Sequence, residues 1–304
     1  MINSIREVYY KYSFVRIVLY PVVFVRRYIL KSIQNIKMSV VDNLGKLLCE
    51  DPLLNIEGFN GDFVIDKHSH IFKRLVLEGE YEPKLIKYCE MLIDKDRDVI
   101  DVGANVGFFT VLFAKSINEN QKVLSIEPTS RALKRLRKNI AINKIHDKVI
   151  LFEGVASNVK GNVEIKTIPG KEEYSSLGSM SHNAITDEEY VLEDVKSLTI
   201  DSLVDINEID PGFIKIDVEG AEHLVFEGAK NVIKKYRPII LSELSDFLLK
   251  KNGASSTEVI NLIRQFNYTI IDPMHPSASL DTNILGDILC IPNEKISKYK
   301  NLRG

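Results

Sequence analysis

The seven residues from Asp101 to Gly107, Asp-Val-Gly-Ala-Asn-Val-Gly, have the types and spacing of a ligand-binding turn. Gly103 and Gly107 allow the chain to turn tightly and a ligand to approach the backbone. A helix that begins at Gly107 would present free N–H groups at the same place. The glycines follow a G-x-x-x-G pattern rather than the G-x-G-x-x-G of a dinucleotide site. Asp101 would repel a phosphate but could hold an ammonium group, so the turn predicts a site for the methionine end of S-adenosyl-L-methionine.

A second acidic residue, Glu127, ends the next expected strand, 24 residues after Gly103. A carboxylate at about this spacing can bind both hydroxyls of a ribose. It would also repel a 2′-phosphate, which disfavours NADP. Asp101 and Glu127 could be ordinary polar residues at strand ends, but their matching positions favour a shared nucleoside site.

The third pattern is an apolar strand that carries Lys215, Asp217 and Glu219 at alternate positions. Alternate residues of a strand point to one face, so these three side chains would lie together if the strand stays extended to Glu219. A buried strand rarely carries three ionisable groups on one face without a use for them. The alternatives are a catalytic cluster and a structural group of salt bridges.

These residues lie at the ends of elements that alternate between strand and helix from about residue 95. The alternation predicts a doubly wound, mostly parallel α/β sheet, in which ligands bind beyond the carboxyl ends of the strands. A helix opening at Pro83 lies in a lead-in segment, 60–95, and the polar insertion 169–194 is expected to be a lid or a binding loop. The expected strands are 98–102, 122–127, 148–153, 162–168, 195–199, 212–218, 238–244, 268–272 and 287–292, and the expected helices are 107–117, 130–143, 222–236 with Gly228 inside it, and 256–266.

The composition is that of an ordinary globular protein, with 304 residues, 45% of them hydrophobic, and a net charge of −2. This is enough material for one large core or two small ones. Three widely spaced cysteines, Cys49, Cys89 and Cys290, argue against a disulfide framework, and no C-x-x-C pair suggests a structural zinc site.

The charge is concentrated at the N-terminus, where residues 1–40 carry seven Lys or Arg and one Glu, a net +6, against −8 for the rest. This arm contains a nine-residue apolar run, 17–25, bounded by Arg16 and Arg26. The run is too short to span a membrane, which needs about 20 residues, and Pro21 would kink it. No small residues mark a signal-peptide cleavage site. The arm is expected either to lie in a membrane interface or to bind a partner, or to pack on the catalytic domain.

Several motifs, taken together and in order, resemble the FkbM family of methyltransferases. The resemblance covers about residues 60–292 and implies an extension at 1–45 followed by a Rossmann-like class I methyltransferase domain at 46–304, with a seven-stranded sheet. It also implies O-methylation of a hydroxyl on a sugar, glycolipid or secondary metabolite. The motifs are residues 79–83, 101–110, 125–128, 139–143, 200–203, 213–222, 227–229 and 237–243.

The same resemblance implies roles for single residues around S-adenosyl-L-methionine. Glu127 would bind the ribose, Ala156 and Ser157 would lie near the adenine, and Glu82 would reach the cofactor from the lead-in segment. The residues expected to surround the methionine moiety are Asp101, Gly103, Asn105 and Gly107.

Methyl transfer to a hydroxyl requires alignment of the reacting atoms and a base for the hydroxyl proton. Asp217 and Glu219 are the leading candidates, and Lys215 could keep one of them ionised or stabilise an alkoxide. His223 is a second candidate base or a solvated surface residue. His182 could enter with the insertion, and His68 and His70 are expected to be exposed. Glu243 could join Asp217 and Glu219 as an oxygen ligand of a divalent metal, but Lys215 offsets that charge, so no metal is predicted.

The main prediction is therefore an enzyme that methylates a sugar or other hydroxyl-bearing acceptor, including a glycolipid. The alternatives are N-methylation of protein or nucleic acid and a non-catalytic module that binds the cofactor at a membrane. An acidic body opposes a phosphate backbone, so no nucleic-acid partner is expected. The location is expected to be cytoplasmic, with the arm, residues 1–40, as a peripheral contact to the inner face of the membrane.

Overall fold

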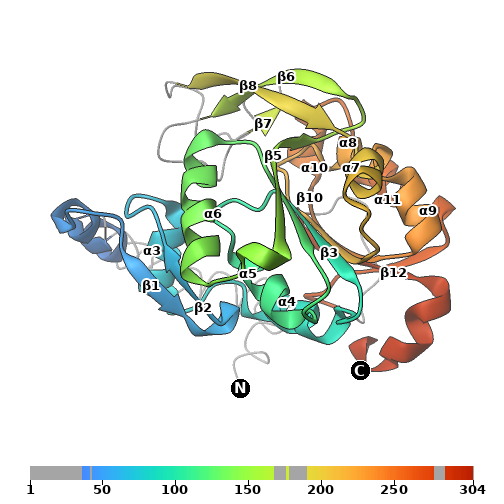
Figure 1. The fold of residues 1–304 in the computed structure, drawn as a ribbon, viewed down its shortest axis with the longest axis horizontal. Coiled ribbons are helices and arrows are strands. Elements are labelled where there is room, and N and C mark those ends of the chain that lie inside the picture. The colour runs from blue at the N-terminus through green and yellow to red at the C-terminus, as the bar shows by residue number, and fades with distance from the viewer. Residues whose placement is uncertain (1–35, 42, 168–175, 178–189, 277–284, 304) are drawn as a thin grey trace, which may run out of the picture.

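A computed structural model of the chain describes residues 36–41, 43–167, 176–177, 190–276 and 285–303 (Figure 1). Residues 1–35 of the N-terminal arm and most of the insertion 169–194, with His182, lie outside the described residues. None of the helices in the described part is both long enough and apolar enough to cross a membrane.

Seven strands form the doubly wound sheet that the alternating pattern predicted. In the order of these strands across the sheet, β3 lies between β4 and β9. Of the seven strands, β12 alone runs in the direction opposite to the other six. The expected mostly parallel α/β fold is thus confirmed. In spatial order the strands are β5 (Val149–Ala156), β4 (Val123–Glu127), β3 (Asp98–Val102), β9 (Pro211–Ile216), β10 (Ile239–Ser245), β12 (Leu285–Pro292) and β11 (Tyr268–Ile271).

Three further strands extend the sheet beyond β5, to ten among the described residues. The strand β8 (Val191–Leu198) pairs parallel to β5, and β6 (Gly161–Thr167) pairs antiparallel to β8. The short β7 (Ser176–Leu177) follows on β6. These strands form the upper edge in Figure 1.

Two hydrophobic clusters cover the two faces of the sheet, because successive residues of a buried strand point to opposite sides. In β3, Val99 belongs to one cluster, and Ile100 belongs to the other. Helix α6 lies on one side of the sheet in Figure 1, and α7, α9 and α11 lie on the other. The first cluster is covered by α4 (Pro83–Leu92), α5 (Phe108–Ser116) and α6 (Ser130–Ile142), and the second by α7 (Ile200–Asn207), α8 (Glu222–Glu227), α9 (Lys230–Tyr236), α10 (Asp246–Lys251) and α11 (Ser256–Gln265).

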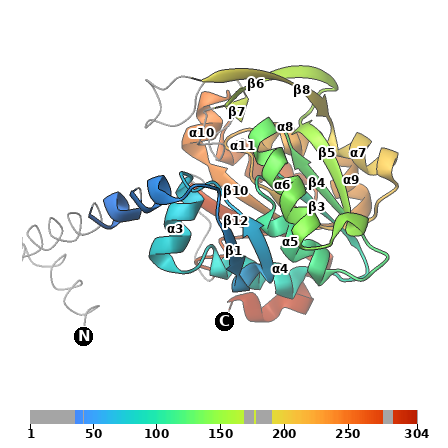
Figure 2. The ribbon, with the colours of Figure 1, turned by 60° about the vertical axis from the view of Figure 1, so that its left-hand side comes forward.

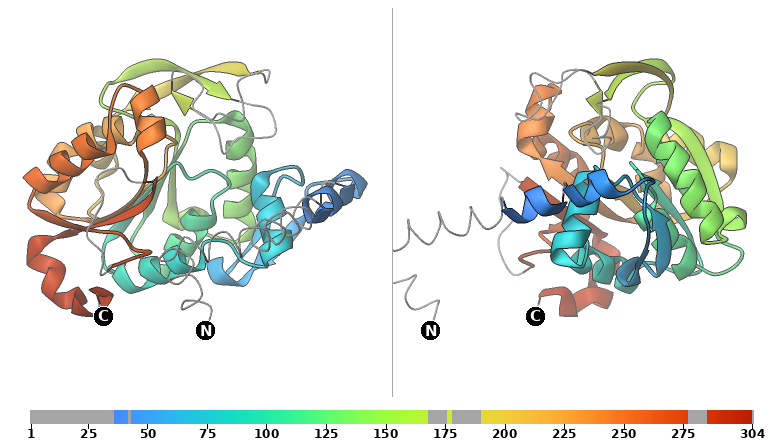
Figure 3. Two further views of the ribbon diagram at one scale, coloured as in Figure 1. Left: turned by 180° about the vertical axis from the view of Figure 1, so that it is seen from behind. Right: turned by 90° about the vertical axis from the view of Figure 1, so that its left-hand side faces the viewer.

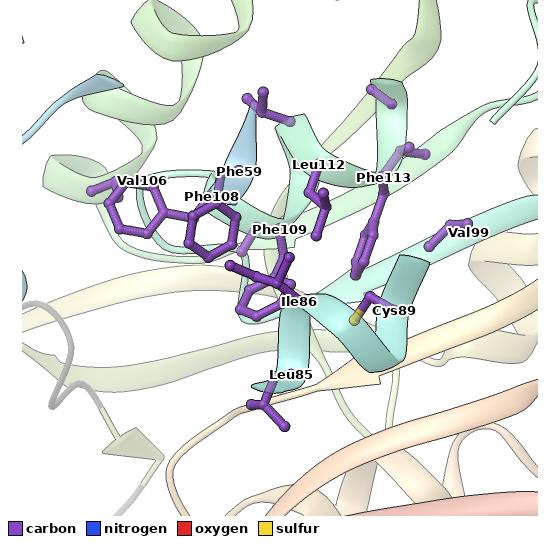
Figure 4. Packing of buried hydrophobic residues seen from close by; sticks show 14 of the residues in the cluster. Phe59, Leu85, Ile86, Cys89, Val99, Val106, Phe108, Phe109, Leu112 and Phe113 are labelled. Atoms are coloured by element: carbon purple, nitrogen blue, oxygen red, sulfur yellow. The ribbon is translucent and has the colours of Figure 1, made fainter. Parts of the chain in front are cut away.

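The first cluster is rich in aromatic side chains. Phe108 and Phe109 of α5 face Ile86 of α4 and pack on Phe59 (Figure 4). The ring of Phe59 lies 5.1 Å from that of Phe108 and is completely buried. This packing attaches the lead-in segment firmly to the start of α5, next to the turn 101–107.

A hairpin of β1 (Leu53–Ile56) and β2 (Gly61–Val64) begins before the expected lead-in segment 60–95, and α3 (His70–Glu78) follows it. The buried Asn139 of α6 accepts a hydrogen bond from the Val64 backbone at 2.7 Å and donates one to the Val106 carbonyl at 2.8 Å. One side chain therefore connects the hairpin to the turn that precedes α5.

The expected helix 222–236 is wrong, because α8 and α9 are two helices separated at Gly228 and Ala229. A Cβ on Gly228 would lie 2.1 Å from the Ser157 carbonyl oxygen. The carboxylate of Asp201 accepts from the Val232 backbone at 2.9 Å and so caps the second helix. The close packing of Gly228 on Ser157 therefore accompanies the end of α8, and the cap from Asp201 marks the start of α9.

Candidate active site

A cavity opens at the carboxyl ends of β3, β4, β9 and β10, where β3 is the strand at which the winding of the sheet reverses. This is the position at which doubly wound sheets bind ligands. The residues that line this cavity include Tyr81, Glu82, Asp101, Gly103, Asn105, Phe108, Phe109, Glu127, Val155, Lys215, Asp217, Glu219 and Glu243.

The turn 103–107 is left-handed at Gly103 (φ 80°), Asn105 (φ 50°) and Gly107 (φ 93°). A Cβ on Gly103 would lie 1.8 Å from the Asp217 carbonyl oxygen, and one on Gly107 would lie 2.4 Å from the Leu136 side chain. Glycine is therefore required at both positions, because the turn packs directly on the end of β9 and on α6. The close approach brings the turn and Asp217 to the same wall of the cavity.

Asp101 is completely buried at the end of β3, and its two oxygens differ in their partners. One oxygen accepts from the Thr110 hydroxyl at 2.6 Å, and the other has no hydrogen-bond partner among the described residues. Burial raises the pKa of Asp101, although the nearby Lys215 ammonium opposes the rise. An unpartnered carboxylate oxygen on the cavity wall fits the ammonium of the methionine moiety of S-adenosyl-L-methionine.

Glu127 is buried at the end of β4 and orders the turn as well as facing the cavity. Its carboxylate accepts from the Asn105 backbone at 2.8 Å, and from the Thr129 backbone at 2.9 Å and hydroxyl at 2.7 Å. Burial raises the pKa of Glu127, and these three hydrogen bonds oppose the rise. A carboxylate can accept about four hydrogen bonds, which leaves capacity for a ribose hydroxyl.

Lys215 is 5% exposed and donates from Nζ to Asp217 Oδ2 at 2.9 Å. The same ammonium lies 4.7 Å from the centre of the Phe109 ring. Burial alone would raise the pKa of Asp217, but the Lys215 ammonium more than offsets it, so the net shift is downward. Asp217 is therefore ionised at neutral pH and can accept a proton.

The expectation of an extended strand to Glu219 is wrong, because β9 ends at Ile216 and Glu219 is left-handed (φ 52°). The chain turns at this point, yet Glu219 still lines the cavity together with Lys215 and Asp217. The three predicted side chains are brought together by the turn after the strand rather than by the strand itself.

Glu243, from β10, joins this group. Carboxylate oxygens of Asp217, Glu219 and Glu243 all lie within 4.8 Å of one another. The charge of Asp217, followed by burial, raises the pKa of Glu243 to about 10. Glu243 therefore keeps its proton at neutral pH, which relieves the repulsion among the three groups. Oxygens in this arrangement could also hold a divalent cation.

The segment before α4 forms another wall. Glu82 is left-handed (φ 50°) directly before Pro83, and its carboxylate lies 3.4 Å from the Arg74 guanidinium. Burial raises the pKa of Glu82, and Lys215 opposes this. Tyr81 lies beside it, with its ring 5.6 Å from that of Phe108. The structure thus places Glu82 at the cavity, as expected.

Four predicted site residues do not line the cavity: Gly107, Ala156, Ser157 and His223. Val155 does so instead of Ala156 and Ser157, because Ala156 points to the second hydrophobic cluster on the opposite face. His223 lies on α8, outside the cavity lining, and burial lowers its pKa. His68 and His70 are exposed, as expected.

Among the cavity residues that the sequence did not predict are Tyr81, Phe108, Phe109 and Val155. Phe108 and Phe109 directly follow the glycine turn, so their position at a helix start was a usable signal. Tyr81 and Val155 carried no such signal, because their positions depend on tertiary packing.

A family model described as the methyltransferase FkbM domain matches residues 101–270. The hexuronic acid methyltransferase AglP of Haloferax volcanii is 24% identical over 229 residues, which cover 72% of this chain and 87% of that protein.

Two solved structures are similar in fold. The methyltransferase FkbM from Methylobacillus flagellatus has 16% identity and a TM-score of 0.43, with 65% of this chain and 44% of that chain covered. This chain thus spans less than half of that protein's length. An O-methyltransferase from Bacillus cereus in complex with SAH has 14% identity and a TM-score of 0.43, with 84% and 97% covered.

Proposed function

The chain belongs to the FkbM family of methyltransferases, whose model matches residues 101–270, and from this premise we propose that it is an O-methyltransferase for sugars. The methyl group would come from S-adenosyl-L-methionine and the acceptor would be a hydroxyl of a glycan or lipid-linked glycan. The observation that supports this most directly is the ionised Asp217, which faces the same cavity as the unpartnered Asp101 oxygen.

The cofactor would lie across the ends of β3 and β4. Asp101 would accept from the ammonium of the methionine moiety, and the backbone of the 103–107 turn would enclose it. Glu127 would accept from a ribose hydroxyl while keeping its bonds to Asn105 and Thr129. When bound, the cofactor supplies an electrophilic methyl group on a sulfonium sulfur.

Asp217 would act as the general base. Its carboxylate would take the proton of the acceptor hydroxyl, whose oxygen would receive the methyl group that the cofactor supplies, with S-adenosylhomocysteine as the leaving group. Lys215 keeps Asp217 ionised and in place through the 2.9 Å contact. Protonated Glu243 can donate a hydrogen bond to an oxygen beside it, so it would help to orient the acceptor hydroxyl.

The acceptor class rests on the relative from Haloferax volcanii, whose name gives a hexuronic acid as substrate. A sugar acceptor also suits a cavity rich in carboxylates, since sugar hydroxyls donate hydrogen bonds to them. We place residues 1–45 as an extension and 46–304 as the catalytic domain. Residues 1–40, with their net +6, would give a cytoplasmic enzyme a peripheral contact to the membrane.

Transfer of a labelled methyl group tests this function. The full chain would be incubated with methyl-labelled cofactor and, separately, with oligosaccharide, lipid-linked sugar, protein and RNA pools. Label should enter a sugar-containing pool as a methyl on oxygen, and the Asp217→Asn variant should serve as the blank. Label in protein or RNA nitrogen would contradict the proposal, as would equal transfer by the variant.

A further inference from the structure

The first described helical residues, 36–41 and 43–47, have two contrasting faces. On one face, Val41 is 4% exposed and belongs to the first hydrophobic cluster, and a Cβ on Gly45 would lie 2.6 Å from the Lys67 carbonyl oxygen. This face anchors the segment tightly beside the start of α3. The helical segment extends outward from the body of the molecule (Figures 1 and 2).

The opposite face is apolar and exposed. Its four side chains are Ile36, Val40, Leu44 and Leu47, which are 64%, 61%, 41% and 79% exposed. At 3.6 residues per turn they fall within about 80° of arc, so they form one continuous stripe, called here the N-terminal apolar stripe. Single exposed apolar residues are common on protein surfaces, but a continuous stripe indicates a contact surface.

Positive charge surrounds this stripe. Lys37 and Lys46 are exposed on either side of it, and Asp42 is the one acidic residue in the sequence from 36 to 48. The chain immediately before it adds to this charge, because residues 1–40 carry a net +6 while the rest of the chain carries −8. An apolar stripe flanked by basic residues is the surface that an anionic lipid interface attracts.

We propose that the N-terminal apolar stripe inserts into the headgroup region of an anionic lipid membrane, with Lys37 and Lys46 at the phosphates. This inference rests on the proposed function in one respect: membrane binding would give the enzyme access to a lipid-linked acceptor. The helical segment packs beside α3, and Ile71 of α3 lines the cavity. Docking would therefore turn the side of the molecule that carries α3 toward the lipid surface; the right-hand view of Figure 3 shows the helical segment lying beside α3.

Charge argues against the two other occupants. If a second copy of the chain docked with its own stripe on this one, the two basic arms, residues 1–40 with a net +6 each, would be brought together. Residues 1–35 would also bring like charge to Lys37 and Lys46, because they hold six basic residues and one acidic residue. An anionic lipid surface is the occupant whose charge complements this face.

Vesicle flotation with the full chain tests the proposal. The vesicles are phosphatidylcholine alone or phosphatidylcholine mixed with phosphatidylglycerol. The wild type should float only with the mixed vesicles and less at high salt. The double variant Val40→Asp/Leu47→Asp should bind at least about tenfold more weakly, because it places two charges in the inserted face.

Two control variants keep the test specific. Ile206→Asp introduces the same charge at a side chain that is 67% exposed on α7, and it should float like the wild type. Lys134→Glu/Lys138→Glu reverses exposed charge on α6 and should also float like the wild type. Loss of flotation in either control would overturn the stripe as the contact.

Other results would also overturn the inference. They are absence of flotation by the wild type, equal flotation by the stripe variant, and a dimer in light scattering that this variant converts to a monomer. Binding of S-adenosylhomocysteine, measured by calorimetry on every variant, should be unchanged. Loss of flotation with intact cofactor binding separates membrane docking from the methyltransferase function, which labelled-methyl transfer tests independently.

Discussion

Asp217 directly follows β9 and Glu243 lies in the neighbouring β10, yet their surroundings shift the two pKa values in opposite directions. Lys215 holds Asp217 ionised, and the charge of Asp217 then keeps the proton on Glu243. Two carboxyl groups with separated pKa values are a common way to supply one base and one hydrogen-bond donor at a single site. The opposite pKa shifts therefore support the two different roles proposed above, with Asp217 as the base and Glu243 as the hydrogen-bond donor.

Variants of this pair should separate the two tasks. Asp217→Asn removes the base and should lower kcat on the order of 100-fold. Glu243→Gln should retain most of the activity at neutral pH, because an amide keeps the neutral charge and the donor of the protonated acid. Steady-state kinetics with a saturating sugar acceptor checks both. Equal loss in the two variants would mean that Glu243 also acts as an ionised group.

Glu127 is expected to contribute to cofactor affinity. Glu127→Ala should weaken S-adenosylhomocysteine binding by about 1–3 kcal/mol, the scale of lost charged hydrogen bonds. Glu153→Ala is a matched control, because Glu153 pairs in register with Glu127 on the next strand but is exposed. Calorimetry should show no change for the control. Tighter binding of NAD than of S-adenosylhomocysteine to the wild type would contradict the cofactor assignment.

At the scale of elements, β10 and β12 place two acidic residues directly opposite each other, Glu243 and Asp287. Burial, with the charges of Glu82 and Asp217, raises the pKa of Asp287 to about 7. The ionised form of Asp287 therefore lowers the free energy of unfolding, because it adds a buried charge beside other acidic groups at the cavity.

Asp287→Asn should make the protein more stable, by an amount that depends on pH. As pH rises from about 4 to about 7, the unfolded state loses the Asp287 proton while the folded state keeps it, so the wild type loses stability in this window. The Tm difference between variant and wild type should thus be small at about pH 4 and larger at about pH 8. Asp246→Asn is a control of opposite sign, because hydrogen bonds from Lys250 and Ser256 lower the pKa of Asp246 to about 2. A Tm difference for Asp287→Asn that does not change with pH would contradict the prediction.

The break between α8 and α9 gives a prediction whose sign distinguishes two folds. In one continuous helix, Gly228→Ala would stabilise the protein by about 1 kcal/mol. In this structure the new methyl group would collide with the Ser157 carbonyl at 2.1 Å, so the variant should be destabilised by about 1–3 kcal/mol. Urea unfolding measures the change, and a stabilised variant would favour the continuous helix.

At the scale of the whole molecule, the cavity is lined entirely by described residues that follow the arm. Deleting residues 1–35 keeps Val41, which is buried in the first cluster, and should leave S-adenosylhomocysteine binding unchanged. Calorimetry and thermal unfolding of the shortened chain check this. Unfolding of the shortened chain would show that the arm packs on the domain, the alternative that its sequence left open.

The sequence alone predicted the alternation of strands and helices, the glycine turn and the acidic residues at the strand ends. These features depend on local periodicity and on residue types at fixed spacing, so they can be read without coordinates. Asp101, Glu127 and Lys215 were found in this way, and each lies at the cavity. The β1–β2 hairpin and α10 were not identified, because their short segments have little periodicity.

Tertiary structure decided the features that depend on distant contacts. Gly228 interrupts a helix because Ser157 packs against it, and Val155 rather than Ala156 faces the cavity because the register of β5 fixes which side each residue points to. The proton on Glu243 likewise depends on Asp217, which lies just after a different strand, β9. Local sequence determined which groups are present at this site, and packing between segments far apart in the chain determined their orientation and charge.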